Sequence, residues 1–418
     1  MKKVYFTLAS LILSILFILT LGELYYRIFP SRGFFSLVDP ELHHTMRPNI
    51  QISKILRNIF ITNSLGWRDK IPNHEIKKIS DKKKRIIFLG DSFTEGIFLN
   101  YKNTFVNITE TKLIESNYDF EILNGGTSSY SPLLEYQRLK KTLQEGYKVD
   151  IVVLLPDISD IQDEVFYFKR DHFDGHHHPP QFMGFRFKYP FMVSLLNKSA
   201  FFRVIVRSLI GDHHRSFGLI PSLYDSSKKV KNIILQTNKG SHNDHNIITS
   251  EDLVKINSPA LIWDLKPFPL EYKPNSSGWG KDGVQFFKND ITKIKKLCDE
   301  HNIQLIVAYY PWPQELYTKE NPSQYEILKI YFKKIFEART LLYGDKPFPI
   351  PSLYENLMQS ICKEQNLNCI DLYPEMRQQN DWYRLYLEDD CHFNEKGNEV
   401  IGKKLAAELI KFLKTSDN

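Results

Sequence analysis

The chain has 418 residues, of which 42% are hydrophobic and 25% are charged, so its composition is that of a folded protein and excludes wholesale disorder. This length is enough for more than one domain-sized unit, or for one core with insertions. The formal net charge is only +6, and the basic residues are spread along the chain. Because the sequence also lacks a nucleic-acid-binding motif, we expect no nucleic-acid partner.

The N-terminal segment predicts a membrane anchor. Residues 1–3 form a tail with two lysines, and residues 4–22 are uncharged and rich in Leu, Ile and Phe. An apolar segment of this length can span a bilayer as a helix. It runs into Glu23 without the small-residue cleavage site that follows a signal peptide, which is the alternative interpretation. The lysines favour a cytoplasmic tail and export of the remaining chain, although Arg27 and Arg32 weaken that bias.

Residues 23–84 are expected to form a juxtamembrane connecting region, because they contain prolines and lack strong periodicity. From residue 85 onward, short apolar runs alternate with stretches of helical periodicity. The runs expected to form strands are 86–89, 120–123, 151–155, 304–310 and 369–372. The stretches expected to be helical are 104–116, 133–145, 286–301, 323–342, 352–365 and a last helix after residue 394. This alternation predicts an α/β fold with a central parallel sheet between layers of helices.

The α/β alternation is interrupted between residues 166 and 280. We interpret residues 166–280 as an inserted subdomain or lid, within a domain formed by residues 85–165 and 281–418. The insertion contains His172 and a run of three histidines at 176–178. Consecutive histidines on one strand or helix cannot all face one ion, so we expect a polar loop there rather than a metal site.

The four cysteines are Cys298, Cys362, Cys369 and Cys391. Cys362 and Cys369 are close enough in sequence to close a small disulfide loop in an oxidising compartment, but the other pairings stay open. The sequence has no Cys-x-x-Cys metal spacing, and we expect neither a metal nor a cofactor.

The stretch Gly-Asp-Ser at 90–92 directly follows the apolar run 86–89, so it falls at the carboxyl end of a predicted strand. In open α/β sheets this edge is where ligands bind. Ser92, held there by small neighbours, is therefore a candidate nucleophile. The structural alternative is a helix N-cap, for which Asp and Ser are both favoured.

Three further residues could complete a site around this serine. Asp389 and His392 lie three residues apart before the last helix, a spacing that lets a carboxylate orient the imidazole that a serine needs as its base. Gly126, in a glycine pair after the second strand, would let the backbone approach a substrate and point an N–H at it. Taken singly, His392 could instead cap a helix or lie on the surface, and Gly126 could be a turn glycine.

Together, these motifs resemble the SGNH (GDSL-type) hydrolase superfamily. The resemblance rests on the Gly-Asp-Ser turn at 90–92, the glycine at 126 and the Asp-x-x-His stretch at 389–392, which is followed by Phe-Asn and a C-terminal helix. It covers residues 85–165 and about 281–418. The fold that it implies is a three-layer α/β/α, flavodoxin-like SGNH fold with a central parallel sheet.

The resemblance also implies roles for individual residues. Ser92 would be the nucleophile, His392 the general base and then acid, and Asp389 its orienting residue. The Ser92 and Gly126 N–H groups would bind the oxyanion. The superfamily's third block normally reads Gly-x-Asn-Asp, whereas this chain has Asp-Ile-Ser-Asp at 157–160, so Ser159 stands where the family has its oxyanion-binding Asn.

A narrower set of proteins shares further features with this chain. The apolar N-terminal segment, the Leu-Gly-Trp-Arg-Asp stretch at 65–69 and the Tyr-Pro-Trp-Pro stretch at 310–313 resemble membrane-anchored bacterial SGNH proteins that add or remove O-acetyl groups on cell-surface polysaccharides. We therefore expect a single-pass protein with an extracytoplasmic serine esterase or O-acyltransferase domain, which forms an acyl-serine at Ser92 and acts on acylated glycan or a small ester.

Partners and alternatives follow from this expectation. One membrane helix cannot move an acyl group across a bilayer, so a transferase would need a separate membrane-bound partner to supply the acyl donor. The first alternative is an esterase or lipase for lipid or small esters, with the insertion as an apolar lid. The second is a non-catalytic SGNH scaffold that binds glycan or an assembly partner.

Overall fold

The computed structural model describes the following residues: 2–28, 36–39, 41–55, 58–166, 194–195, 198–199, 201–202, 279–316, 330–332, 353–388 and 390–416. Nearly all of the predicted insertion and of the predicted helix at 323–342 lies outside these residues, and so does the histidine group at 172 and 176–178.

A mixed eight-stranded sheet forms the centre of the described domain, in the order β10-β9-β8-β6-β7-β5-β4-β3. Its parallel strands are β6 (Lys84–Gly90), β7 (Phe120–Asn124), β8 (Ile151–Leu155), β9 (Gln304–Tyr309) and β10 (Asn368–Asp371). Every residue of β8 is buried, as expected for a parallel strand covered by helices on both faces. The strands predicted from apolar runs are therefore confirmed.

The region expected to connect the anchor to this domain contributes strands of its own. β3 (Gln51–Ile55), β4 (Asn58–Thr62) and β5 (Arg68–Asp69) extend the sheet in antiparallel fashion beyond β7. β1 (Ser36–Asp39) and β2 (His43–Met46) form a separate two-stranded sheet. β5 in particular could not be predicted from an apolar pattern, because both of its residues are charged although they are buried.

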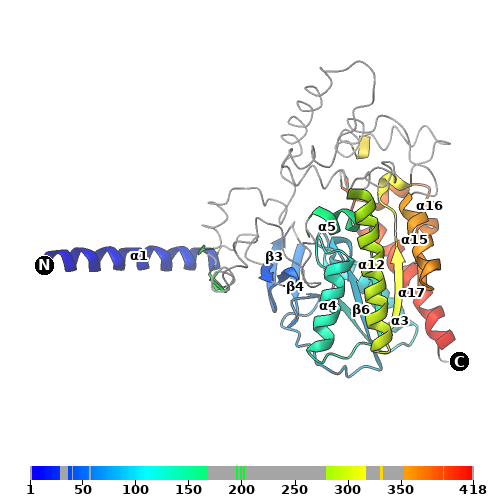
Figure 1. Cartoon of the computed structure of the whole chain (residues 1–418), viewed down its shortest axis with the longest axis horizontal. Helices are drawn as coiled ribbons and strands as arrows, with labels where there is room; N and C mark the ends of the chain where they lie inside the picture. Colours follow the sequence, from blue (N-terminus) through cyan, green and yellow to red (C-terminus); the bar gives the residue numbers. More distant parts are fainter. Residues whose placement is uncertain are drawn as a thin grey trace, which may run out of the picture.

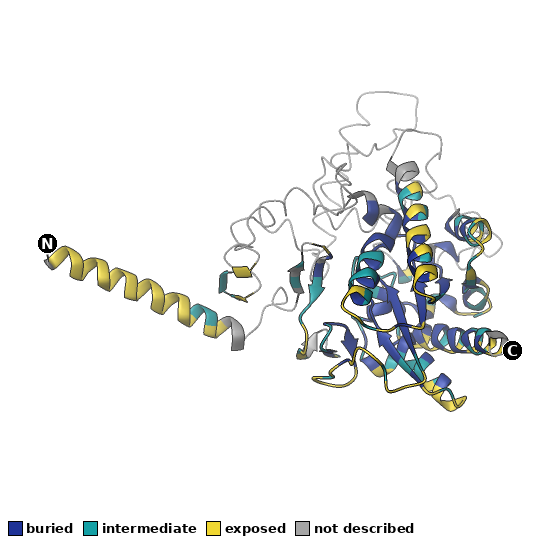
Figure 2. Cartoon of the chain, turned by 60° about the horizontal axis from the view of Figure 1, so that its bottom comes forward, coloured by how far each residue is buried: buried dark blue, intermediate teal, exposed yellow. Residues whose placement is uncertain are grey.

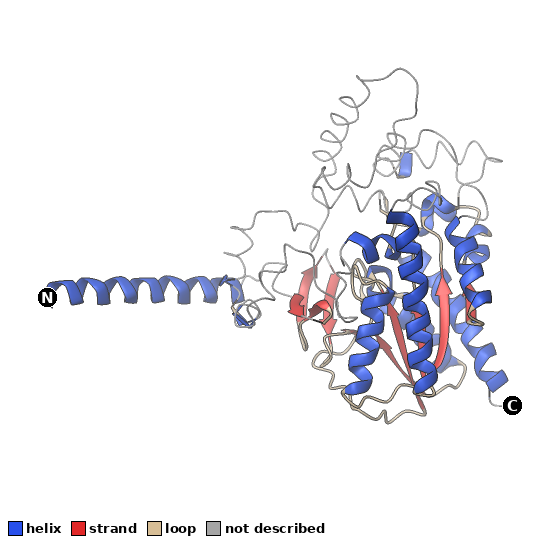
Figure 3. Cartoon of the chain, in the orientation of Figure 1, coloured by secondary structure: helices blue, strands red, loops and turns tan. Residues whose placement is uncertain are grey.

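Helices cover the sheet in two layers. α3 (Phe105–Glu115) packs along α17 (Glu395–Ser416) on one face, and α4 (Pro132–Gln144), α5 (Asp160–Phe166) and α12 (Trp279–Glu300) pack together on the other (Figure 1). α15 (Leu353–Glu364) precedes β10 in the chain and α16 (Tyr373–Arg377) follows it, and β10 forms one end of the sheet. In Figure 3 the central strands lie among the helices, which is the predicted three-layer α/β/α arrangement, whereas β3 and β4 stand outside the helical layers.

The N-terminal helix stands apart from this domain. α1 (Lys2–Ile28) extends away from the sheet, and Figure 2 shows it exposed along most of its length. Its segment Lys3–Tyr25 is long and apolar enough to cross a membrane. A membrane anchor and a signal sequence share this property, since both expose an apolar helix near the N-terminus.

Candidate active site

Ser92 lies at the junction that the sequence predicted. β6 ends at Gly90, and a single-turn helix, α2 (Ser92–Glu95), begins directly at the serine. Asp91 caps this turn, because its carboxylate accepts a hydrogen bond of 2.8 Å from the Phe93 N–H. The turn ends at Gly96 with φ 65°, a left-handed conformation that suits glycine. The Asp91 side chain therefore performs the capping role, and the Ser92 hydroxyl remains available for other contacts.

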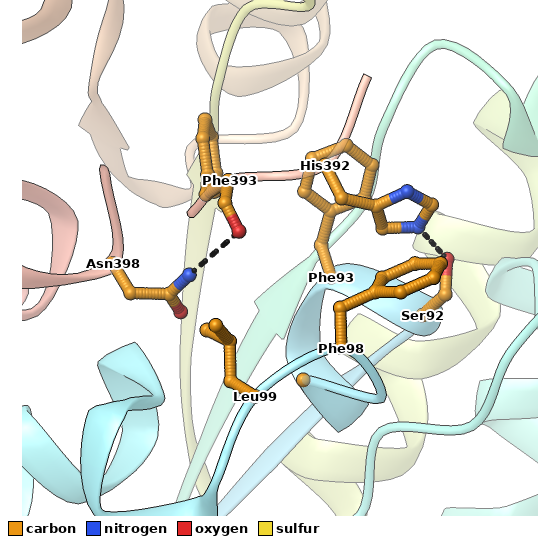
Figure 4. A pocket seen from close by; sticks show the side chains of 8 residues that line it. Ser92, Phe93, Phe98, Leu99, His392, Phe393 and Asn398 are labelled. Carbon is orange, nitrogen blue, oxygen red and sulfur yellow. Dashed lines mark hydrogen bonds between the residues drawn. The ribbon is translucent and has the colours of Figure 1, made fainter. Parts of the chain in front are cut away.

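The Ser92 hydroxyl contacts His392, which is 300 residues away in sequence, at a distance of 2.7 Å between Oγ and Nε2 (Figure 4). His392 comes from the loop before α17, and its ring is packed between two phenylalanines. Phe93 stacks on it with ring centroids 4.5 Å apart, and Phe98 lies tilted at 4.7 Å. This packing holds the imidazole in one position beside the hydroxyl.

The second ring nitrogen of His392 is bonded to Asp390. Its Nδ1 lies 2.5 Å from the Asp390 Oδ1, which also accepts the His392 backbone N–H at 2.9 Å. A carboxylate can only accept from Nδ1–H, so in the neutral ring Nε2 is unprotonated and accepts the Ser92 hydroxyl proton. Burial opposes the charge on Asp390, but the adjacent His392 outweighs it and lowers the pKa of that carboxyl. The arrangement is that of a serine nucleophile with an oriented base.

The carboxylate that the structure places beside His392 is that of Asp390, the neighbour of the predicted Asp389. The Asp-x-x-His spacing pointed to Asp389, which lies outside the described residues, whereas the carboxylate in contact with the ring belongs to Asp390. The two aspartates are adjacent in the sequence, so both lie close to His392 along the chain. Spacing alone could not distinguish them.

Of the predicted oxyanion donors, the Ser92 N–H is the best placed. It belongs to the first residue of α2, where backbone N–H groups have no acceptor within the helix. A substrate carbonyl next to the Ser92 hydroxyl would lie close to this donor, because both belong to the same residue.

Gly126, whose N–H was predicted to bind the oxyanion, lies close to the backbone of α2. Its N–H donates to the Asn124 side chain at 3.0 Å, so in this structure the group is already satisfied. Its lack of a side chain is required by packing, since a Cβ on Gly126 would lie 2.4 Å from the Glu95 nitrogen in α2. The glycine therefore allows the loop after β7 to approach the backbone of the turn that carries Ser92.

Ser159 is likewise occupied. Its hydroxyl and its backbone N–H donate to the same oxygen of Asp157, at 2.5 and 2.6 Å, and the residue is buried. The hydroxyl thus closes a local turn after β8. Among the described residues, it makes no hydrogen bond to Ser92 or His392. The role that the resemblance implied for Ser159 is not confirmed.

A small pocket opens beside the Ser92–His392 pair (Figure 4). It has an empty volume of about 200 Å³, including its open mouth. Its walls come from α2, the loop that follows it, the loop that carries His392 and the start of α17. The lining residues are Ser92, Phe93, Gly96, Phe98, Leu99, His392, Phe393 and Asn398.

Two residues that sequence reasoning missed hold this pocket together. Asn398 accepts the Phe105 N–H at 2.9 Å and donates to the Phe393 carbonyl at 3.2 Å, which ties the histidine loop to α3. Phe98 shields the imidazole from the other side. The only signal for Phe98 was its position six residues after Ser92, and an aromatic residue there is equally consistent with the core.

No family model matches the chain. A GDSL esterase/lipase of Arabidopsis thaliana is 30% identical over 67 residues, which make up 14% of this chain and 28% of that protein. The GDSL esterase/lipase WDL1 of Oryza sativa subsp. japonica is 29% identical over 65 residues, or 16% and 24% of the two chains. The chain therefore spans about a quarter of the length of these curated relatives.

Among solved structures, the chain matches a lipase/acylhydrolase from Enterococcus faecalis with 12% identity and a TM-score of 0.33, over 78% of this chain and 95% of that one. The strand order and the layers described above are consistent with the α/β SGNH fold. In its motifs and in this short stretch of sequence, the chain resembles the SGNH (GDSL-type) hydrolases.

Proposed function

We propose that the protein is a serine esterase or O-acyltransferase that works through an acyl-serine at Ser92. The observation that carries the proposal is the 2.7 Å contact between Ser92 Oγ and His392 Nε2, together with the bond from His392 Nδ1 to Asp390. A serine hydroxyl becomes an effective nucleophile when an oriented base takes its proton.

The reaction has two steps. Ser92 Oγ attacks the acyl carbonyl while its proton moves to His392 Nε2, and the imidazolium then gives this proton to the departing alcohol as the ester bond breaks. In the second step His392 takes a proton from water or from a sugar hydroxyl, whose oxygen attacks the acyl-serine, and returns that proton to Ser92. Asp390 stabilises the imidazolium in both steps. Water as the acceptor gives an esterase, and a sugar hydroxyl gives a transferase.

Several features support a short acyl group on a cell-surface glycan. The pocket beside Ser92 is small and is lined by Phe98 and Leu99, which suits an acetyl group better than a long chain. The stretches at 65–69 and 310–313 resemble those of anchored bacterial SGNH proteins of polysaccharide O-acylation. The exposed apolar helix α1 supports a membrane anchor, and the disulfide between Cys362 and Cys369 supports an oxidising, extracytoplasmic compartment.

A non-catalytic scaffold that binds glycan or a partner is the second candidate. The observation in its favour is that two of the predicted oxyanion donors, in Gly126 and Ser159, are engaged by Asn124 and Asp157. The loss of one oxyanion donor typically costs a factor of about 10²–10³ in rate. A site with the Ser92 N–H as its main donor would therefore be a slow catalyst or none.

The test uses the full-length chain purified in detergent. We expect a fluorophosphonate probe to label the wild type but not Ser92→Ala, and to label His392→Ala far more slowly. Ser116→Ala, which changes an exposed serine at the end of α3, is the matched control and should label like the wild type. Hydrolysis of p-nitrophenyl acetate should exceed that of the octanoate.

The outcomes separate the candidates. Labelling that depends on Ser92 and His392 supports the acyl-serine mechanism, and release of acetate from an acetylated oligosaccharide would then identify the glycan as substrate. Preference for the octanoate would favour a lipase. If the folded wild type neither labels nor turns over an ester, the mechanism is wrong, and binding of glycan to the same protein becomes the next measurement.

A further inference from the structure

A group of buried carboxylates lies behind the nucleophile. Asp91 follows β6, Asp157 and Asp160 follow β8, and Glu135 stands in the first turn of α4, so all of them gather at the carboxyl edge of the parallel strands. Their exposed fractions are 4% for Asp91 and 0% for the other three. Burial of several like charges at one place is costly unless something neutralises them.

The oxygens of three of these side chains converge. One carboxylate oxygen from each of Asp91, Asp157 and Asp160 lies within 4.8 Å of the others. Asp157 is held in place by the Trp312 indole N–H, which donates to its Oδ2 at 2.8 Å, and by the two donors of Ser159. The carboxylate is thereby fixed in orientation rather than free to turn away from its neighbours.

Unsatisfied oxygens surround the same place. Among the described residues, the Oδ1 of Asp160, both carboxylate oxygens of Glu135 and the hydroxyl of Tyr310 are buried without a hydrogen-bond partner. Asp160 is itself one of the three converging residues, and Glu135 and Tyr310 each interact electrostatically with Asp91 and Asp157. Unpaired polar groups of this kind are rare in folded interiors and call for a ligand, a water or a proton.

The charges of the group oppose one another. Asp91, Asp157 and Asp160 are all buried, and their ionised carboxylates would repel one another at these separations. Either shared protons or a cation can relieve such repulsion.

We propose that Asp91, Asp157 and Asp160 bind one divalent hard cation of the Ca²⁺ class, with Glu135 and the Tyr310 hydroxyl completing the surroundings. The donors are all oxygens, which such cations prefer, and Ca²⁺ tolerates irregular arrangements of six to eight oxygens at about 2.3–2.6 Å. Oxygens on one ion at these distances are at most about 5 Å apart, which agrees with the observed convergence.

The position of this site gives the ion a structural role next to the chemistry. Asp91 caps α2 through the Phe93 N–H, and its other oxygen lies 3.4 Å from the Ser92 hydroxyl. An ion on Asp91 would fix the turn that carries the nucleophile without contacting the acyl group. The inference goes beyond the proposed activity, because a scaffold without catalysis would bind the ion equally well.

The experiment measures ion binding directly. The full-length protein in detergent is stripped with EDTA, dialysed and titrated with Ca²⁺ and separately with Mg²⁺, with bound metal counted and thermal unfolding followed. We expect about one Ca²⁺ per chain, a rise in Tm of several degrees at saturation and weaker binding of Mg²⁺. Asp160→Asn and Glu135→Gln should each lower Ca²⁺ affinity roughly tenfold or more.

Asp119→Asn is the matched control, because Asp119 is an exposed carboxylate that pairs with Lys82 away from the site. It should bind Ca²⁺ like the wild type. If the wild type binds no Ca²⁺ at millimolar concentration and its Tm is unchanged, the proposal is wrong. It is also wrong if Glu135→Gln raises Tm without Ca²⁺ and leaves affinity unchanged, since shared protons would then neutralise the group. Should Asp160→Asn fail to fold, Glu135→Gln alone decides. None of these readouts depends on acyl transfer.

Discussion

The pairing of His392 with Asp390 leads to a sharp prediction. In Asp390→Asn, the amide oxygen can still accept the His392 backbone N–H, which Asp390 accepts at 2.9 Å, so the loop is retained. The charge that faces Nδ1 across 2.5 Å is lost. The substitution therefore removes the stabilisation of the imidazolium and leaves the local fold intact.

The size of the effect follows from the bond that is lost. A hydrogen bond to a charged group contributes about 1.5–3 kcal/mol, and each 1.36 kcal/mol of transition-state stabilisation is a factor of about ten in rate. We therefore expect kcat/KM for p-nitrophenyl acetate to fall about ten- to two-hundredfold in Asp390→Asn. A larger loss would indicate that the ring also adopts the wrong tautomer, as happens in serine protease triads.

The matched variant is Asp389→Asn, which changes the neighbouring residue that the sequence pattern favoured. We expect its kcat/KM to stay within about threefold of the wild type, because the described contact to His392 comes from Asp390. Both variants are assayed as full-length protein in detergent, with thermal unfolding as the check on folding. A large loss in Asp389→Asn with near-normal activity in Asp390→Asn would refute the assignment.

Three further predictions concern stability and packing. Burial lowers the pKa of His44 from 6.5 to about 4. As the pH falls, the unfolded chain therefore binds a proton at this residue before the folded chain does, and the free energy of unfolding decreases by about 3 kcal/mol between pH 6.5 and 4. In His44→Gln, urea unfolding should show a smaller decrease over the same pH range. Gly126→Ala forces a Cβ against the Glu95 backbone and should cost about 1–3 kcal/mol, with a drop in fluorophosphonate labelling rate. Replacing Cys362 and Cys369 by serine removes a cross-link between residues that are 7 positions apart in the sequence. The free energy of unfolding should fall by about 2 kcal/mol, which would be measured as a lower urea midpoint.

Each of these has an outcome that contradicts it. An unchanged pH dependence in His44→Gln would mean that this ring is already charged in the folded protein. A fully stable and reactive Gly126→Ala would mean that the loop after β7 does not approach α2 as closely as described. For the disulfide, the reduced wild type should have the same urea midpoint as the double serine variant. If the double variant instead has the midpoint of the oxidised wild type, the predicted loss of stability is wrong.

The core of the fold was predictable because its parallel strands are buried on both faces. Such strands appear in the sequence as unbroken apolar runs, and β6 and β8 were found on that basis. β3, β4 and β5 were missed, because a short antiparallel strand at the side of a sheet is stabilised by its neighbours rather than by its own pattern. Arg68 in β5 illustrates this. Its side chain is buried, and its guanidinium donates hydrogen bonds to the carbonyls of Ile59 and Leu99.

The site could be predicted where the proposed chemistry requires a particular residue type, such as a serine or a histidine, in a loop next to the end of a strand. The sequence pointed to the Ser92–His392 pair, and the structure brings the two side chains together. It could not anticipate that Ser159 would turn its hydroxyl to Asp157, because a bond between residues two apart depends on the local turn. The buried group behind Ser92 was equally hidden, since its members come from separate strands and a helix.

The strands upstream of residue 85 set a practical limit on how the chain can be shortened. Trp67 and Ile76 belong to the main hydrophobic core, and Arg138 from α4 lies over the Trp67 ring. A protein cut at the first predicted strand would lose this part of its interior and would expose the side of β7 that β5 now covers. Uncovered strand edges recruit other chains, so such a fragment is expected to aggregate. A soluble form for crystallisation should therefore begin ahead of β3, so that the whole sheet is retained.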